Sequence, residues 1–165
     1  MTDLTVIVVN WNTRDLLAEC IRSIRQGVRD LDVEVIVVDN GSADGTVDML
    51  REDFPWVRLI ASAESAGLGR ANDQALDQCD GGYLALLGSD TKVFTGSLEQ
   101  LADFLDVHPR AGLAGLRLPN ADRTFQASYS PFPTLGRESL VLSTLGRQLI
   151  RAPFPSHGPR LPEGP

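Results

Sequence analysis

Residues 35–46 read VIVVDNGSADGT and decide the fold, because four apolar residues run directly into an acid, a glycine turn and a helix start. We predict a strand over 33–38, because its apolar run at 35–38 is typical of a buried strand. Asp39 would then lie at the carboxyl end of that strand, where open α/β sheets place their ligand crevice. A carboxylate there can accept hydrogen bonds from a ribose or a base. The stretch therefore predicts a nucleotide site at a strand end.

A second apolar run ends in the same way. Residues 4–9 (LTVIVV) are apolar at five of six positions and lead into the polar loop 10–13 (NWNT), which ends at a candidate helix cap. Further strand candidates lie at 57–60, 83–87 and 111–118, separated by stretches with helical spacing. This alternation predicts an α/β fold with a mostly parallel sheet and helices on its faces.

Apolar residues at helical spacing indicate which helix faces enter the core. The first helix has the set Leu16, Leu17, Cys20, Ile21 and Ile24, and a later helix from Ser97 has the set Leu98, Leu101, Ala102 and Leu105. A short helix capped by Ser42 or Asp44 should end at Pro55. Residues 67–78 predict another helix, and residues 138–150 have helical spacing as well.

Composition and charge restrict the function classes. The chain has 165 residues, 42% of them hydrophobic, which is typical of one globular domain with a substantial core. Its net charge of -7 argues against a nucleic-acid partner. No apolar run approaches the roughly 18 residues that span a bilayer, and the N-terminus lacks a basic signal start, so a cytoplasmic location is expected. Cys20 and Cys79 lack CxxC spacing and are interpreted as buried hydrophobes.

The end of the chain has a different composition. Residues 151–165 contain five prolines and two glycines, which disfavour a packed element. We interpret residues 151–165 as a linker or an exposed tail, and residues 1–150 as one domain.

Two further segments could carry chemistry. Asp90 follows the apolar run 83–87 closely, so its carboxylate should share a sheet edge with Asp39 and could hold Mg²⁺ or Mn²⁺ against a diphosphate. The alternative is that Asp90 only caps the next turn. Residues 66–72 (AGLGRAN) offer glycine N–H groups, a helix N-terminus and Arg70 to a phosphate, or form an ordinary helix start. They do not follow the first strand, so the dinucleotide fingerprint of dehydrogenases is not met.

The remaining aromatic and histidine residues are assigned no chemistry by their pattern alone. Trp11 and Trp56 are interpreted as partly buried core residues rather than stacking platforms. His108, before a proline, and His157, in the tail, have no visible partner and are expected to be solvated. The absence of a GxSxG elbow and of a Walker loop argues against the simplest hydrolases and ATPases.

Taken in order, the segments 8–12 (VVNWN), 37–46 (VVDNGSADGT), 67–72 (GLGRAN) and 87–91 (LGSDT) resemble the family 2 glycosyltransferases of the GT-A fold. The resemblance is closest to the rhamnosyltransferase-like branch and extends from Thr5 to about Ile150. It implies a domain that binds a nucleoside diphosphate sugar and a divalent cation.

The resemblance also implies residue roles. The base and ribose would be held by Val9, Asn10, Trp11, Asn12 and Asp39. The diphosphate and sugar would be lined by Gly67, Gly69, Arg70 and Asn72, and Asp90 matches the last acid of the family's metal motif, for Mg²⁺ or Mn²⁺. The favoured donor is dTDP-rhamnose, with a UDP-sugar next. Acceptors in the family are glycans or lipid-linked glycans, which is compatible with peripheral contact at the inner face of a membrane.

The implied chemistry is inverting displacement at the anomeric carbon. The cation and Arg70 would stabilise the leaving diphosphate while a carboxylate deprotonates the acceptor hydroxyl. The sequence departs from the family pattern twice. Gly88-Ser89-Asp90 stands where Asn-Pro-Asp or Asp-x-Asp is usual, and no Glu-Asp pair that would supply the catalytic base follows, since Glu138 and Glu163 are isolated. The resemblance therefore implies a donor half that is truncated before the acceptor half.

Two alternatives stand beside this hypothesis. The first is a non-catalytic nucleotide-sugar-binding or regulatory module that has the same crevice. The second is a flavodoxin-like or response-regulator domain, which shares the βα alternation, although the first strand here ends without an acidic pair.

Overall fold

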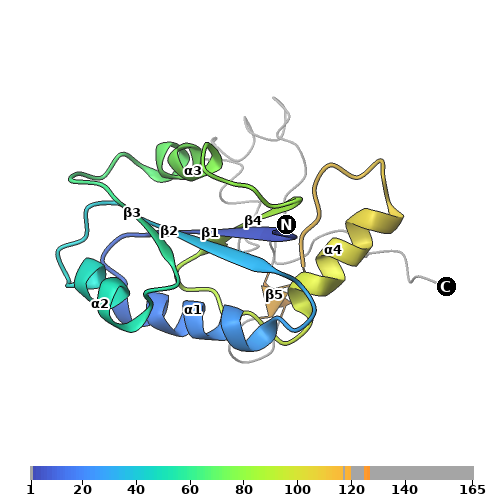
Figure 1. Ribbon diagram of the computed structural model, residues 1–165, viewed down its shortest axis with the longest axis horizontal. Helices are drawn as coiled ribbons and strands as arrows, with labels where there is room; N and C mark the ends of the chain where they lie inside the picture. The colour runs from blue at the N-terminus through green and yellow to red at the C-terminus, as the bar shows by residue number, and fades with distance from the viewer. Residues whose placement is uncertain (1, 117, 120–124, 127–165) are drawn as a thin grey trace, which may run out of the picture. The chain divides into compact units, whose positions relative to one another are not determined.

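The computed structural model describes residues 2–116, 118–119 and 125–126 (Figure 1). Its elements are β1 (Leu4–Asn10), α1 (Arg14–Gly27), β2 (Val33–Asp39), α2 (Thr46–Asp53), β3 (Arg58–Ala61), α3 (Leu68–Leu76), β4 (Tyr83–Gly88), α4 (Ser97–Val107), β5 (Leu118–Pro119) and β6 (Phe125–Gln126). The helix predicted at 138–150 and the tail at 151–165 lie outside the described residues. The chain divides into two compact units, Met1–Ala114 and Gly115–Pro165. A single domain over 1–150 stays a prediction.

The first unit is built on four parallel strands in the order β3-β2-β1-β4. The chain begins in the middle of the sheet, builds outward to β3, and then returns past β1 to β4. The strand order therefore reverses between β1 and β4, which is where open α/β sheets form a ligand crevice. The register pairs Asn10 with Asp39 and Val9 with Gly88, so the strands end at one common edge.

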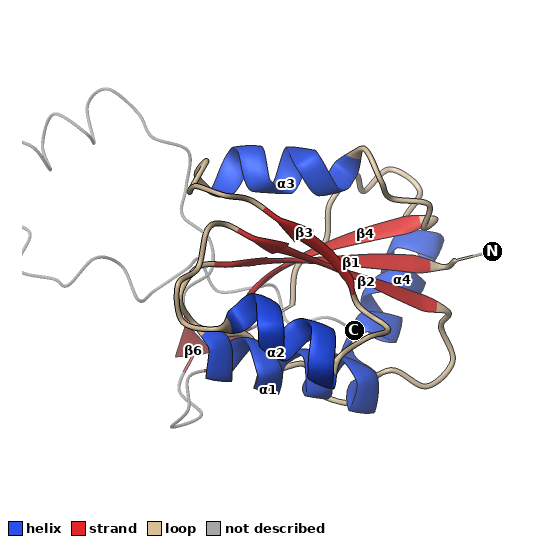
Figure 2. Ribbon diagram, turned by 60° about the vertical axis from the view of Figure 1, so that its left-hand side comes forward, coloured by secondary structure: helices blue, strands red, loops and turns tan. Residues whose placement is uncertain are grey.

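The two faces of the sheet carry two separate cores. Figure 2 places α1 and α2 on one face and α3 on the other. The larger core joins alternate strand residues such as Val6 and Val35 to Ile21 of α1 and Leu50 of α2. The smaller core joins the residues between them to α3 and consists of Ile7, Ile36, Val38, Ala71 and Ala75. The central strands β1 and β2 are covered on both faces, which explains why their sequences are nearly continuous apolar runs.

The helices of the first unit lie close to the predicted ranges, but two residues predicted to be buried are exposed. Leu16 is exposed and lies outside the buried face of α1, because it precedes by one position the residue that faces the sheet, Leu17. Trp11 is 60% exposed and is not a core residue. Trp56 is 39% exposed and so partly buried, as predicted, and the Arg25 guanidinium lies 5.0 Å from its ring centroid. His108 is exposed as predicted, but it does have a partner, because its Nδ1 lies 2.8 Å from the Phe104 carbonyl oxygen.

The strand predicted at 111–118 is wrong over its described first part. Residues 111–116 form no regular element, and only Leu118–Pro119 is a strand, paired antiparallel with Phe125–Gln126. The segment 111–116 (AGLAGL) contains two glycines, and glycine weakens a strand because it contributes no side chain to pack. None of the described helices combines the length and the apolar character that crossing a bilayer requires.

Candidate functional site

The carboxyl ends of β1 and β2 carry a buried polar cluster. Asn10 and Asp39 are 0% and 1% exposed, and the Asn10 amide donates from Nδ2 to Asp39 Oδ1 at 3.1 Å. The same Nδ2 lies 3.2 Å from Ser42 Oγ and 3.3 Å from Thr46 Oγ1. We call Asn10, Asp39, Ser42, Asp44 and Thr46 the β1/β2 hub. A buried carboxylate requires such partners, because an unpaired charge away from water is strongly unfavourable.

Asp39 also shapes the turn that follows it. Its Oδ2 accepts a hydrogen bond from the Ser42 backbone N–H at 3.0 Å, so both carboxylate oxygens have a donor. Gly41 has a φ of +79°, and a side chain at this position would come within 3.1 Å of the Glu64 backbone. Glycine is therefore needed at position 41 both for its conformation and for its small size.

Asn12 joins the loop after β1 to the loop after β2. It has a φ of 53°, a conformation that asparagine tolerates better than most residues. Its backbone N–H donates to Ser42 Oγ at 2.9 Å, and its Oδ1 accepts the Ala43 N–H at 2.8 Å. These two bonds make the loops one polar surface, on which Trp11 and Asn12 are exposed.

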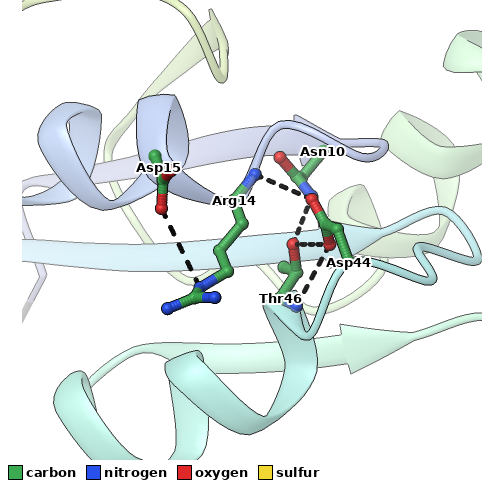
Figure 3. A network of polar contacts seen from close by, with 5 residues as sticks. All are labelled: Asn10, Arg14, Asp15, Asp44 and Thr46. Carbon is green, nitrogen blue, oxygen red and sulfur yellow. Dashed lines mark hydrogen bonds and ion pairs between the residues drawn. The ribbon is translucent and has the colours of Figure 1, made fainter.

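Asp44 holds the first amides of two helices at once (Figure 3). Its Oδ2 accepts the N–H of Arg14, where α1 begins, at 2.9 Å, and its Oδ1 accepts the N–H of Thr46, where α2 begins, at 3.1 Å. Oδ1 also accepts the Thr46 hydroxyl at 2.6 Å. Partial burial opposes ionisation, but the hydrogen bonds from Thr46 and Arg14 outweigh it and lower the pKa of Asp44 below its ordinary value.

The predicted caps are thus partly corrected. The residue before α1, Thr13, makes no capping bond with its side chain, and the residue before α2 is Gly45, again without a side-chain cap. Asp44, which lies outside both helices, caps α1 and α2 instead, because the loop after β1 and the loop after β2 lie side by side. Ser42 bonds across to the first loop instead.

The start of α3 is brought to the same edge by Asn40. Asn40 is 4% exposed, and its Oδ1 accepts the Ala66 N–H at 2.8 Å. Gly67 directly precedes α3 with a φ of +81°, which explains the glycine there. A side chain at Gly69 would meet open space, so packing does not require that glycine.

Arg70 and Asn72 lie in the first turns of α3, and their exposure differs. Asn72 is half-buried, whereas Arg70 is exposed. Arg70 lines an open hollow of about 470 Å³ together with Ala66, Asp73, Gln74 and Asp77. Two carboxylates therefore share this surface with the guanidinium, and the hollow is not a purely cationic pocket.

Asp90 lies just beyond β4 and differs from Asp39 in its surroundings. It is exposed, and its carboxylate folds back over Gly88, so that a side chain at position 88 would come within 2.7 Å of Asp90 Oδ1. Within the described residues no group of three or more His, Cys, Asp or Glu residues could hold a metal. We call Gly88, Ser89 and Asp90 the β4 loop.

The β4 loop also contacts α1. Cys20 is 1% exposed, and burial, together with the nearby Asp90 charge, raises the pKa of its thiol to about 11. The thiol therefore stays protonated at neutral pH, which confirms the interpretation of Cys20 as a small buried residue. Cys79 is half-buried, and burial together with the charge of Glu34 raises the pKa of its thiol too.

The structure brings together most of the predicted residues at the carboxyl edge of the sheet. Val9 is half-buried and pairs with Gly88 across the order reversal, and Asn10 contacts Asp39 directly. Sequence reasoning missed the side-chain roles of Thr13, Thr46 and Ser89. Thr13 Oγ1 lies 2.7 Å from Asn10 Oδ1 and 2.7 Å from Ser89 Oγ. The signal available was a hydroxyl residue after each strand end, which is common and therefore unspecific.

Comparison with known proteins finds similar glycosyltransferases. The N-acetylglucosaminyl-diphospho-decaprenol L-rhamnosyltransferase of Mycobacterium tuberculosis is 28% identical over 149 residues, which cover 83% of this chain and 48% of that protein. The chain thus spans about half the length of this relative. The putative teichuronic acid biosynthesis glycosyltransferase TuaG of Bacillus subtilis is 30% identical over 62% of this chain and 41% of that protein.

Solved structures share the fold. The mannosyltransferase PcManGT from Pyrobaculum calidifontis, in complex with GDP-Man and Mn²⁺, is similar with a TM-score of 0.56 and 27% identity, over 64% of this chain and 34% of that one. TarS of S. aureus in complex with UDP-GlcNAc is similar with the same TM-score of 0.56 and 27% identity, over 65% of this chain and 32% of that one. The profile of glycosyl transferase family 2 matches residues 5–155, and this chain belongs to that family.

Proposed function

We propose that this chain binds a nucleoside diphosphate sugar and a divalent cation, as the donor-binding part of a glycosyltransferase. The observation that carries the proposal is the edge where the strand order reverses, because it places the buried Asn10–Asp39 pair and the exposed Asp90 at the ends of neighbouring strands. The complexes of PcManGT with GDP-Man and Mn²⁺ and of TarS with UDP-GlcNAc support this ligand class.

The nucleoside would lie against the β1/β2 hub. Trp11 and Asn12 face solvent there, next to Asp39. A hydrogen bond from the base or ribose to Asp39 would use the second lone pair of an oxygen that already accepts one bond, and an ionised carboxylate has this capacity. The side chains of Asn10 and Val9, at the end of β1, would pack beneath this surface on its buried side.

The diphosphate would lie between the β4 loop and the start of α3. The first N–H groups of a helix have no carbonyl partner within it and favour an anion, which assigns this role to the turn that starts at Gly67 and includes Gly69. Arg70 would stabilise charge on the leaving diphosphate. Asn72 would contact the diphosphate or the sugar from the same helix.

The donor atoms present are compatible with Mg²⁺ or Mn²⁺. Asp90 offers one exposed carboxylate, and Mg²⁺ is commonly held by one or two carboxylates with the remaining positions taken by substrate phosphates and water. When bound, the cation would supply positive charge against the diphosphate. In the implied reaction the bond from the anomeric carbon to the diphosphate oxygen breaks, the acceptor oxygen bonds to that carbon from the opposite side, and a base takes the acceptor proton.

The finer assignments are also proposals. We favour dTDP-rhamnose as the donor, because the Mycobacterium tuberculosis relative is named an L-rhamnosyltransferase. A UDP-sugar is next, as in the TarS complex. The acceptor would be a glycan or a lipid-linked glycan, reached by peripheral contact with the inner face of a membrane. No base for acceptor deprotonation is assigned within this chain.

Calorimetric titration of the chain with UDP, dTDP and GDP, each with and without Mn²⁺, tests the donor site directly. We expect one nucleotide to bind, more tightly with Mn²⁺. Asp90→Ala should abolish the metal-dependent part of binding. Asp103→Ala, which removes an exposed carboxylate of α4, is the matched control and should leave it unchanged.

Three outcomes are informative. Binding of one nucleotide, lost with Asp90→Ala only, would support the donor site and identify its base. Equal losses in both variants would overturn the role of Asp90. No binding of any nucleotide by a folded sample would overturn the proposed function.

A further inference from the structure

Two hydroxyls meet where the strand order reverses. Thr13 follows β1 and Ser89 follows β4, and their Oγ atoms are 2.7 Å apart. Thr13 Oγ1 is also 2.7 Å from Asn10 Oδ1. A continuous series of hydrogen bonds therefore runs from the β4 loop through Thr13 and Asn10 to the carboxylate of Asp39.

The direction of every bond in this series follows from Asp39. An ionised carboxylate only accepts, so the Asn10 amide must turn its Nδ2 toward Asp39. Its Oδ1, which only accepts, then faces Thr13, and Thr13 must donate to it. A hydroxyl has one hydrogen, so Ser89 must in turn donate to Thr13. One buried charge at the end of β2 thus orients the hydroxyl of Ser89, which follows β4, two strands away in the sheet.

This series of hydrogen bonds connects Asp39, where the nucleoside would bind, to the β4 loop, where the cation would bind. Ser89 directly precedes Asp90, and Gly88 before it has no side chain. The hydrogen bond between the Ser89 hydroxyl and Thr13 therefore connects the β4 loop to the loop after β1. One nucleoside diphosphate with its cation would span the distance from Asp39 to Asp90. A loop held at a fixed position raises affinity because less conformational freedom is lost on binding.

We propose that Ser89 is a positioning residue that couples cation binding at Asp90 to nucleoside binding at the β1/β2 hub through Thr13 and Asn10. The inference rests on the proposed function and deepens it. Without the hydrogen bond between Ser89 and Thr13, the cation could still contact Asp90 and the nucleoside could still contact the β1/β2 hub. The direct contact between the cation and the diphosphate would remain, but the part of the mutual enhancement that depends on the fixed relative position of the two sides would be lost.

The test measures this enhancement rather than affinity alone. For UDP, dTDP or GDP, whichever binds the unchanged chain most tightly, calorimetry gives the ratio of the dissociation constants without and with saturating Mn²⁺. Ser89→Ala should reduce this ratio about tenfold, which corresponds to about 1.4 kcal/mol. The metal-free affinity should change less than about twofold, since the Asn10–Asp39 bond is kept. A loss of fold or of packing would weaken binding with and without Mn²⁺ alike.

Two Thr13 variants and one distant serine complete the design. Thr13→Val removes the hydroxyl and should reduce the ratio like Ser89→Ala, whereas Thr13→Ser keeps the hydroxyl and should restore it. Ser97→Ala, at the start of α4, removes a hydroxyl that bonds the Phe94 carbonyl and should leave the ratio unchanged. Circular dichroism and thermal unfolding establish that each variant is folded.

The outcomes separate the two proposals. If the unchanged chain binds with Mn²⁺ enhancement and Ser89→Ala keeps the full ratio, the coupling is overturned and the donor site stands. If Thr13→Ser behaves like Thr13→Val, the hydroxyl series is overturned as the cause. If the unchanged chain binds no nucleotide, the proposed function fails and the coupling fails with it.

Discussion

The β1/β2 hub and the β4 loop lie at the same edge of one sheet, yet they are built in opposite ways. In the hub, Asp39 is 1% exposed and both of its oxygens accept hydrogen bonds. In the β4 loop, Asp90 is exposed and lies close to Gly88. Within the described residues it belongs to no group of three or more His, Cys, Asp or Glu side chains that could hold a metal ion. The fold thus gives each Asp39 oxygen a hydrogen-bond donor, whereas the Asp90 carboxylate lies at the surface.

This difference predicts different consequences for mutation. A buried charge that loses a partner destabilises the folded state, because water cannot replace the lost bond. An exposed carboxylate that is removed changes the folded state little and affects ligand binding instead. Substitutions in the hub should therefore lower the free energy of unfolding, and substitutions in the β4 loop should lower ligand affinity.

The largest effect is expected for Asn10→Ala. This change removes the donor to the buried Asp39 and the acceptor for Thr13, and we expect the free energy of unfolding to fall by about 3 kcal/mol. Urea unfolding with an unchanged slope measures it. Asp90→Ala is the comparison and should change stability by less than about 0.5 kcal/mol. Equal losses in the two variants would contradict the contrast between the hub and the β4 loop.

The next effect is expected for Asp44→Ala. Because one carboxylate holds the first amides of α1 and α2, its loss removes two caps, and we expect a destabilisation of about 2 kcal/mol. Asp48→Ala removes an acid in the first turn of α2 and should cost only about 0.5 kcal/mol. If both variants cost the same, Asp44 acts through its charge alone and not through its two bonds.

The pH dependence of stability tests the same residue in another way. The pKa of Asp44 is lowered in the folded protein, so its stabilising contribution is present above the unfolded pKa of about 3.9 and is lost as pH falls through the lower folded value. We expect the stability difference between the unchanged chain and Asp44→Asn to shrink as the pH falls below about 4. Urea midpoints measured from pH 7 to pH 2 would show it. A difference that stays constant over this range would contradict the shift.

The smallest effect is expected for Gly88→Ala. The new methyl group would displace the Asp90 carboxylate, and forcing a side chain from its rotamer costs about 0.5–1.5 kcal/mol. We expect Mn²⁺-dependent nucleotide affinity to fall roughly threefold to tenfold at nearly unchanged stability. Gly112→Ala, where a methyl group meets open space, is the control. Unchanged affinity would show that the position of Asp90 over Gly88 does not matter for the cation.

The sequence predicted the two central strands, β1 and β2, well because both are buried on both faces. Such strands are continuous apolar runs, and β1, β2 and β4 lie within a residue or two of the predicted ranges. The same rule failed at 111–116, where each of two leucines follows an alanine and a glycine and no strand forms. Apolar composition alone does not distinguish a strand from an irregular segment, because pairing with a neighbour decides it. The exposure of Trp11 was missed for a related reason, since burial depends on what packs against a side chain.

The sequence by itself determined the parallel α/β fold, the acids at two strand ends and the membership of a family, because these depend on local runs and on ordered motifs. Only the tertiary structure decided that Asp44 holds two helices, that Asn12 joins two loops, and that Ser89 reaches Asp39 through Thr13 and Asn10. The partners in these contacts come from different loops, up to 76 positions apart in the chain. Their distances are set by the strand order and register, which no local pattern contains.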